Sequence, residues 1–560
     1  MTQTEPNEAS PEGGSLPKKA IFLLVDALRY DVLANLDAAK AIAPNMARIA
    51  ERGIIRKCVT NAQSTQFVLP SLFTQTYPLD YGGYNNGIRE RPQSFVESLK
   101  SAGFETHLMS SSNQIGVTLG FDRGFDTIRT TTDYRTLLEQ RISRTLTYEI
   151  KLWRDGERPE AETIAIIQKE LGLLLDVLET GIREHDKSLW PAALHRINDR
   201  VSNGCAAERR LLKEEPLLII AKLERIPASV YWQFLGSRTI SPVKLFLARA
   251  KAGFAWRLHR WAAHRWWFPF MLVGHFQVKS GEVISGITNF IRENRDKSWY
   301  VHMHAMDAHD CRCLNRPLHM LYRLTYLPRW WHARLTGKTK RRWTYDTSIM
   351  YVDDCLGELF DTLEKTGQLE STSILITGDH GFDYASSPRG RKHVAIRNYR
   401  EDIEVPMVLV CDFETRQNAG EIVDNGMLDS MGLCASFLDA LNVPQHQSFK
   451  GKSVFRGGRK SVISENAGSG NADIERRDLY FTVTTEDHKL MTVLVGSELQ
   501  LLHLYDLQND PDELNDLLGQ DKYEELVHPL VSTLMQERGE IFQLRNAATG
   551  LSHQEWRLAS

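Results

Sequence analysis

Several features that mark special classes of protein are missing from this chain of 560 residues. Its first 19 residues are polar and contain no apolar core segment, so they do not resemble a secretory signal, and we expect a disordered tail. A run of about 18 apolar residues, the length that spans a bilayer, occurs nowhere. No internal repeat is found, which argues against a repeat architecture. The length and composition predict a soluble protein of two or three compact domains.

Cysteine is scarce in this sequence. The 7 cysteines are an odd number scattered along the chain, which does not suit a disulfide framework. A reducing compartment fits this usage, so we expect a cytoplasmic protein. Cys311 and Cys313 form the one close pair, a weak metal signal that ordinary thiols explain better. The net charge of −3 gives no preference for nucleic acid, which is not expected as a partner.

Short apolar runs that are followed by polar groups occur on both sides of the middle of the chain. Residues 20–25 precede Asp26, and residues 374–376 shortly precede Asp379 and His380. Such runs are typical of buried parallel strands, and in open α/β sheets the binding crevice lies beyond the carboxyl ends of the strands. We therefore expect the three side chains to meet at one edge of a sheet. Taken alone, Asp26 is better explained as a helix N-cap.

Hydroxyl residues cluster just ahead of a short apolar helix, where Ser64 and Thr65 lie. The first N–H groups of a helix stabilise an anion, so a hydroxyl at this position is either a cap or a nucleophile. Together with Asp26, Asp379 and His380, such a hydroxyl completes a ligand set for one Mn²⁺, Zn²⁺, Mg²⁺ or Ca²⁺ ion. A metal beside a hydroxyl lowers the pKa of that hydroxyl and neutralises charge on an attacked ester.

Two further histidines, His309 and His393, follow other predicted strands in loops. Either imidazole can bind the oxygens of an ester or protonate its leaving group. For each histidine taken alone, a packed or exposed loop position is the better explanation. From the residues themselves, the sequence indicates a metal-dependent ester hydrolase or transferase.

Strand patterns give way to long amphipathic helices over the middle of the chain, for example at residues 162–184. The fold class we expect is therefore α/β, a mostly parallel sheet flanked by helices, with a large helical insertion and a small C-terminal α+β subdomain. The predicted parts are a tail at 1–19, a catalytic domain at 20–129 and 298–445, the insertion at 130–297, and the subdomain at 446–560.

Acidic residues are absent from residues 254–268, which carry three arginines and four tryptophans. Residues 322–343 repeat this composition with seven Lys or Arg and three Trp. Basic residues mixed with tryptophan suit a membrane interface, a glycan or nucleic acid. An amphipathic helix that covers the core with Arg over Trp is the structural alternative. The predicted peripheral membrane contact involves Phe254, Trp256, Trp261 and Trp266, and a lipid-linked or glycan substrate is a related expectation.

Taken in chain order, these fragments resemble the sulfatase-like branch of the alkaline phosphatase superfamily. Residues 25–29 resemble the strand end that carries the first metal ligand of the family, residues 62–78 its nucleophile helix, and residues 377–381 its second metal motif. Further matches lie at residues 120–126, 306–309, 345–357, 404–406 and 504–511. The resemblance implies an alkaline-phosphatase-like fold and a hydrolase, or a phosphotransferase, acting on a phosphoric or sulfuric ester.

The sequence departs from the sulfatase pattern at the nucleophile. True sulfatases carry Cys-x-Pro-x-Arg, whose cysteine becomes formylglycine, and this chain has no such motif. The resemblance places Thr65 there, with Ser64 as the alternative, and it puts Ala27 where many sulfatases have a second Asp. The implied ligands of a single ion are Asp26, Thr65, Asp379 and His380. This set is similar to that of the phosphoethanolamine and phosphoglycerol transferases of the superfamily.

The remaining site residues also follow from the resemblance. His309 and His393 are implied as catalytic residues, and Arg391, Lys392 and Ser64 as substrate-binding residues. A threonine ester cannot collapse as a formylglycine hydrate does and must be attacked again at its central atom. We therefore favour a phosphate ester, cleaved through a covalent Thr65 intermediate, over a sulfate ester. The alternatives are a sulfatase with an unmodified nucleophile and a non-catalytic scaffold that binds a membrane or a glycan.

Overall fold

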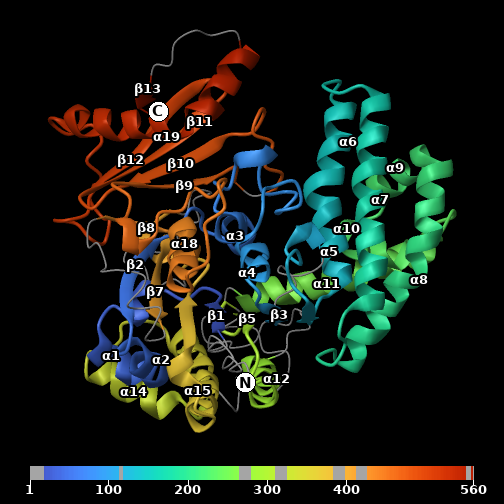
Figure 1. The fold of residues 1–560 in the computed structure, drawn as a ribbon. Coiled ribbons are helices and arrows are strands. Elements are labelled where there is room, and N and C mark those ends of the chain that lie inside the picture. The colour runs from blue at the N-terminus through green and yellow to red at the C-terminus, as the bar shows by residue number, and fades with distance from the viewer. Residues whose placement is uncertain are drawn as a thin grey trace, which may run out of the picture.

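The computed structural model describes residues 18–111, 118–263, 279–309, 324–382, 398–411, 426–468, 470–549 and 556–558. Its main elements are two sheets, helices on both faces of the larger sheet, and a separate group of helices (Figure 1). No helix in these ranges is long and apolar enough to cross a membrane.

A mostly parallel sheet positions the predicted site. In the described part of the chain it has eight strands, in the order β4-β3-β5-β1-β6-β7-β2-β8. Strand β1 lies in the interior because all seven of its residues are buried. The strands β4, β3, β5, β1 and β6 run parallel, and β7 is antiparallel to both β6 and β2. Their bounds are β1 Lys19–Val25, β2 Ile54–Val59, β3 Glu105–Ser110, β4 Thr127–Thr130, β5 Trp299–Ala305, β6 Thr372–Thr377, β7 Glu404–Val410 and β8 Leu428–Asp429.

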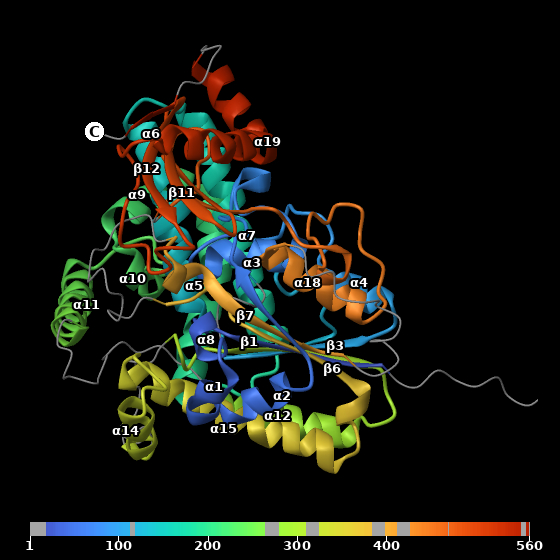
Figure 2. The ribbon, with the colours of Figure 1, turned by 90° about the vertical axis from the view of Figure 1, so that its left-hand side faces the viewer.

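Alternate side chains of the sheet enter two hydrophobic cores, one on each face. Phe22 and Leu24 of β1 face the first core, whereas Ile21 and Leu23 face the second. Helices α3, α4 and α18 cover the first face, and α1, α2, α12, α14 and α15 cover the second (Figures 1 and 2). Their bounds are α1 Leu36–Ile42, α2 Pro44–Ala50, α3 Thr65–Thr74, α4 Phe95–Ser101, α12 Ser280–Glu293, α14 Leu327–Leu335, α15 Trp343–Lys365 and α18 Ser430–Ala440.

The middle of the chain forms a helical group with a core of its own. Leu138, Leu175, Val201 and Tyr231 lie in this core, which contains no residue of the sheets. A π-helical turn, Ile142–Leu146, joins the first two helices. The helices are α5 Tyr134–Arg141, α6 Thr147–Arg154, α7 Glu160–Glu184, α8 Ala192–Glu214, α9 Pro216–Arg225, α10 Ala228–Tyr231 and α11 Pro242–Ala263. The next helix, α12, returns to the sheet, so the predicted insertion at 130–297 contains a segment that packs on the catalytic core.

The C-terminal part is a second, mostly antiparallel sheet with a closing helix. This sheet has the order β13-β12-β11-β10-β9 and lies on the α3 side of the larger sheet (Figure 2). Its elements are β9 Val462–Asn466, β10 Leu479–Thr484, β11 His488–Val495, β12 Glu498–Asp506, β13 Trp556–Leu558 and α19 Tyr523–Thr549. The predicted fold class, a helix-flanked mostly parallel sheet with a small C-terminal subdomain, is confirmed.

Candidate active site

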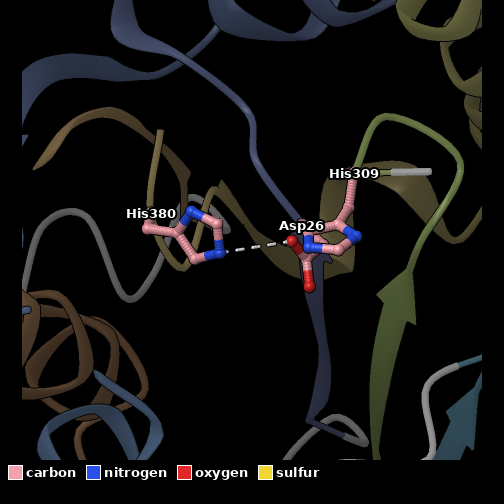
Figure 3. A group of neighbouring side chains, drawn as sticks. All are labelled: Asp26, His309 and His380. Carbon is pink, nitrogen blue, oxygen red and sulfur yellow. Dashed lines mark ion pairs between the residues drawn. The ribbon is translucent and has the colours of Figure 1, made fainter. Parts of the chain in front are cut away.

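Asp26, Thr65 and His380 converge from three elements at the carboxyl edge of the sheet. Asp26 follows β1, His380 follows β6, and Thr65 is the first residue of α3. The Thr65 hydroxyl donates a hydrogen bond to Asp26 Oδ2 at 3.0 Å, and its Oγ1 lies 3.2 Å from His380 Nε2. His309, which follows β5, joins Asp26 and His380 in a group whose ligand atoms lie within 4.8 Å of one another (Figure 3).

The carboxylate of Asp26 is fully buried yet held in its charged form. Burial alone would raise its pKa, but the nearby His309, a hydrogen bond with His304 and the charge of His380 together hold the pKa well below its usual value. An ionised carboxylate at this place attracts a cation or a cationic group.

Two buried carboxylate oxygens at this edge have spare capacity to accept. Among the described residues, neither Asp26 Oδ1 nor Asp379 Oδ2 has a hydrogen-bond partner, although both lie near His380 Nε2, at 3.5 and 3.6 Å. Buried carboxylate oxygens are costly to leave without partners, so a divalent ion fits this donor set well. Asp26, His304 and Asp379 form a second group with ligand atoms within 4.8 Å. The residues present therefore fit the metal expected from the sequence.

The backbone around the acids is shaped for close approach. Ala27 has φ +63°, a strained conformation for a residue with a Cβ, and its N–H donates to Asp379 Oδ1 at 3.2 Å. A Cβ at Gly378 would meet the carbonyl oxygen of Leu28 at 2.6 Å. This glycine is therefore required for space between two strand ends rather than for a left-handed turn.

His304 is a site residue that the sequence analysis did not select. Its Nε2 lies 3.2 Å from Asp26 Oδ2, and its Nδ1 has no partner among the described residues. Parallel pairing of β5 with β1 sets His304 opposite Leu24, which brings its ring beside Asp26. The sequence alone does not give the pairing register of β5 with β1. Without that register, a histidine within an apolar strand is interpreted as a buried core residue.

The structure separates the two candidate nucleophiles by position. Ser64 is the N-cap residue of α3, whereas the Thr65 hydroxyl points at Asp26 and His380. Three other predicted site residues, Arg391, Lys392 and His393, lie outside the described residues. The described geometry thus brings together Asp26, Thr65, His309, Asp379 and His380.

A pocket between α3 and the helical group is lined by Gln66, the residue after Thr65. Arg144 of the π-helical turn, a kind of turn that is frequent at functional sites, also lines it. Arg144 Nη1 is buried with no partner in the described residues, and burial lowers the pKa of this guanidinium. Arg141 is paired with Glu170 instead. The other lining residues include Asn85, Arg89, Leu119, Leu137, Gln140, Leu174 and Val177.

Comparison with known proteins gives matches along most of the chain. The family model described as Sulfatase matches residues 18–192 and 248–443, and the model described as N-sulphoglucosamine sulphohydrolase, C-terminal, matches residues 397–540. One similar protein is the multifunctional alkaline phosphatase superfamily protein PehA of Trinickia caryophylli, 26% identical over 201 residues, or 33% of this chain and 38% of that protein. Another is an N-acetylglucosamine-6-O-sulfatase of Bacteroides thetaiotaomicron, 25% identical over 210 residues, 34% of this chain and 35% of that protein.

Among solved structures, the phosphonate monoester hydrolase of Agrobacterium radiobacter shares the fold. The TM-score is 0.53 at 13% sequence identity, and the match covers 94% of this chain and 96% of that one. At this identity the likeness concerns the fold alone. The match covers less than two thirds of the length of these two relatives. It therefore does not show that this chain has their activities.

Proposed function

The chain belongs to the sulfatase family, and from this premise we propose that it is a metal-dependent hydrolase of a sulfate ester with Thr65 as its nucleophile. The observation that carries the proposal is the position of the Thr65 hydroxyl. It is buried at the start of α3, within hydrogen-bond distance of Asp26 and His380, beside two carboxylate oxygens with spare capacity. A hydroxyl there meets both a basic neighbour and the positive end of a helix.

The choice of ester differs from the one that the sequence alone favoured. The unmodified threonine argued for a phosphate ester, whereas the family model and the named sulfatase relative favour a sulfate ester. We therefore put the sulfate ester first. A phosphate or phosphonate ester is the second candidate, and the threonine at the nucleophile position is the observation that favours it.

The proposed reaction has two displacements at the central atom. Thr65 Oγ1 attacks sulfur while its proton passes to Asp26 Oδ2, which accepts its hydrogen bond; the ester S–O bond breaks, and the departing oxygen takes a proton from His309. Water then attacks the same sulfur and gives one proton to His309, the bond from sulfur to Oγ1 breaks, and sulfate leaves while Oγ1 takes its proton back from Asp26. Asp26 orients the Thr65 hydroxyl by accepting its hydrogen bond. Hydrolysis, rather than transfer to an acceptor alcohol, is the outcome we propose.

Asp26, Thr65, Asp379 and His380 would hold one divalent ion. The ion would supply positive charge to the sulfuryl oxygens and favour the ionised hydroxyl. The Ala27 N–H donates to Asp379 Oδ1, and Asp379 Oδ2, which has no partner in the described residues, would be the oxygen available to the ion. His304 holds Asp26 Oδ2 in place, which leaves Asp26 Oδ1 available.

A sulfated sugar is the substrate class that we propose. A relative named for N-acetylglucosamine-6-O-sulfate esters supports it, as does the pocket between α3 and the helical group. That pocket offers the unpaired Nη1 of Arg144 to a second anionic group, and Gln66 and Gln140 to hydroxyls. The insertion supplies part of its wall, through Gln140, Arg144 and Leu174, which would make this pocket particular to this chain.

Three aryl esters test the proposal on metal-loaded protein: a sulfate, a phosphate monoester and a phosphate diester, with Thr65→Ala as the blank. Thr65-dependent release from the sulfate alone supports the main proposal. Release from the phosphate esters alone replaces it by the second candidate. A peptide containing Thr65 that gains the mass of one sulfo group after rapid acid quench would support the covalent step, and equal turnover by Thr65→Ala would refute it.

The location stays a prediction from the sequence, namely the cytoplasm with peripheral contact to the membrane. Fractionation of producing cells into soluble and membrane parts tests it. Recovery of the protein outside the cytoplasm would contradict it.

A further inference from the structure

One helix of the insertion presents apolar side chains to solvent along its whole length. Helix α11 contacts the rest of the helical group through Leu245 and Ala248, which are buried. Val243, Phe246 and Phe254 are each 69% exposed, and Leu247 is 61% exposed. Isolated exposed apolar residues are ordinary on soluble proteins, but such a concentration on one helix marks an interaction site.

Five of the exposed apolar residues of α11 form a single stripe, whereas Trp256, which is 58% exposed, lies outside it. At 3.6 residues per turn, positions 243, 246, 247, 254 and 261 fall on one side of a helix, and positions 245 and 248 fall on the opposite side. We call Val243, Phe246, Leu247, Phe254 and Trp261 the α11 stripe. It faces away from the core that anchors the helix, so no other part of the helical group's core covers it.

The charges that flank the stripe are all positive. Helix α11 contains no Asp or Glu, whereas Lys244 and Lys251 lie along one side of the stripe and Arg249 along the other. Lys244 and Arg249 donate hydrogen bonds to the backbone carbonyls of Gln233 and Arg225, and the Lys244 ammonium also lies 5.0 Å from the centre of the Phe234 ring, so each contacts a neutral group. Apolar residues bordered by Lys and Arg, without acids, match the boundary between acyl chains and anionic headgroups.

A second exposed patch lies on the same side of the molecule. Trp331 and Leu335 of α14 are exposed, with Leu335 at 81%. Figure 2 shows α11 and α14 on one side, which is also the side of the carboxyl ends of β1 and β6. Both helices therefore lie on the side of the sheet edge that is followed by Asp26.

We propose that the α11 stripe docks on a lipid bilayer that contains anionic lipids. The stripe enters the boundary between headgroups and acyl chains, and Lys244, Lys251 and Arg249 contact the headgroup phosphates. Docking brings the catalytic edge of the sheet to the membrane surface, where a membrane-borne ester is available. The docking itself does not depend on which ester the enzyme hydrolyses.

Vesicle flotation of the full chain tests this proposal. Vesicles of phosphatidylcholine alone are compared with vesicles that also contain phosphatidylglycerol. The test variant is Phe246→Ser/Leu247→Ser, and the matched control is Leu217→Ser/Leu514→Ser, which removes two equally apolar residues exposed by about half elsewhere on the surface, at 50% and 51%. Each protein is first checked for a cooperative thermal transition.

We expect the wild type and the control to float with the anionic vesicles, and the stripe variant to partition at least about tenfold more weakly. A Lys244→Gln/Lys251→Gln variant should lose the preference for anionic lipid and the sensitivity to salt. If the stripe variant fails to fold, Val243→Ser/Phe254→Ser replaces it.

Three results would overturn the proposal. The wild type does not float with anionic vesicles, or the stripe variants float as the wild type does. Alternatively, the wild type is a dimer at working concentration and the stripe variant a monomer, which would make a second copy the occupant. Turnover of a soluble aryl ester should be equal in all these proteins, so failure of the docking proposal is separate from failure of the proposed reaction.

Discussion

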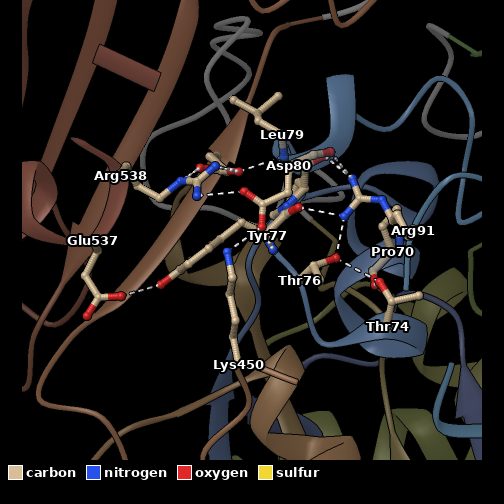
Figure 4. A network of polar contacts seen from close by, with 12 residues as sticks. Pro70, Thr74, Thr76, Tyr77, Leu79, Asp80, Arg91, Lys450, Glu537 and Arg538 are labelled. Carbon is tan, nitrogen blue, oxygen red and sulfur yellow. Dashed lines mark hydrogen bonds and ion pairs between the residues drawn. The ribbon is translucent and has the colours of Figure 1, made fainter. Parts of the chain in front are cut away.

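The two ends of helix α3 lie in two buried charged clusters that are built in opposite ways. At its start, Thr65 meets Asp26 and His380, and carboxylate oxygens remain without hydrogen-bond partners in the described residues. Just beyond its end, Asp80 meets Arg538 and Lys450, and both of its oxygens accept hydrogen bonds (Figure 4). The first cluster can therefore still bind a cation, whereas in the second, which we call the complete cluster, both oxygens of Asp80 already have partners.

The complete cluster joins the catalytic part to the C-terminal part. Arg538 of α19 donates to Asp80 Oδ1 at 2.8 Å and to Glu465 Oε2 at 2.7 Å, and its guanidinium lies 4.4 Å from the centre of the Tyr77 ring. Burial alone would lower the pKa of Arg538, but Glu465 and Asp80 outweigh it and raise that pKa. Nearby, buried Arg91 donates to the carbonyl oxygens of Tyr77, Pro78 and Asp80.

The comparison teaches that burial of charge alone does not identify a site. Both clusters bury ionised carboxylates, and both include a threonine of α3, Thr65 or Thr74. Spare hydrogen-bonding capacity is what distinguishes them, because an unpaired buried oxygen costs free energy unless a ligand satisfies it. Arg144 Nη1 in the adjacent pocket is one of several other buried polar atoms without a partner in the described residues.

The largest effect should come from replacing the hydroxyl of each α3 threonine by a methyl group and comparing the two losses of turnover. Thr65→Val keeps the side-chain shape but removes the nucleophile, so turnover of an aryl sulfate should fall at least about 10³-fold. Thr74→Val removes a 2.8 Å hydrogen bond to the Pro70 carbonyl and should cost about 1 kcal/mol of stability without changing turnover. Kinetics and thermal unfolding of both variants measure this; equal turnover losses would erase the distinction between the clusters.

A large loss of stability should follow from breaking the complete cluster. Arg538→Met leaves Glu465 buried and unpaired, which should lower the free energy of unfolding by about 3–5 kcal/mol. The control, Arg456→Met, breaks an ion pair of a largely exposed arginine with Asp439 and should cost less than about 1 kcal/mol. Denaturant titration measures both. A small loss for Arg538→Met would mean that the cluster does not hold the two parts together.

A moderate effect is expected in the pocket beside Thr65. Arg144→Ala should raise KM for an anionic sugar sulfate about tenfold, since a charge-assisted hydrogen bond is removed, and should leave KM for a small aryl sulfate unchanged. Arg154→Ala, on an exposed ion pair with Glu224, serves as the control. Equal KM changes for both substrates would place Arg144 outside sugar recognition.

The smallest effect should appear in the way the thermal stability depends on pH at acidic pH. Burial alone would raise the pKa of Asp80, but Arg538 and Lys450 outweigh it and lower that pKa. A lowered pKa stabilises the fold at pH above the unfolded value of about 3.9, and this contribution disappears as the pH falls through the folded pKa. The unfolding midpoint should therefore rise with pH less steeply near and below this value in Asp80→Asn than in the wild type.

Thermal scans across pH measure this slope, with the exposed Asp155→Asn as the control. An identical slope in Asp80→Asn and the wild type would show that Asp80 does not contribute to this pH dependence.

The sequence predicted the parts of the site that follow apolar runs. Asp26, Asp379 and His380 could be found because each comes shortly after a buried strand, and the carboxyl ends of parallel strands share one edge. His304 could not be found, since its role depends on the pairing register of β5 with β1. Strand β2 was missed because Arg56 and Lys57 interrupt its apolar pattern.

The complete cluster was beyond sequence reasoning for a related reason. Asp80 lies 458 residues before Arg538, and Glu465 lies 73 residues before it, and nothing in their local sequence indicates that they meet. The α11 stripe was partly predicted from its Trp and Arg content. Trp266 lies outside the described residues, and Val243, Phe246 and Leu247 gained significance only when the buried side of the helix was known.

The most direct test of the account is calorimetric titration of the metal-free protein with a divalent ion such as Mn²⁺. The proteins compared are the wild type, Asp379→Asn and Thr74→Val. The account predicts one ion per chain for the wild type and for Thr74→Val, and binding at least about 100-fold weaker for Asp379→Asn, because a ligand oxygen is replaced. Unchanged affinity in Asp379→Asn, or no binding by the wild type, would contradict the claim that the incomplete cluster at the start of α3 is a metal site.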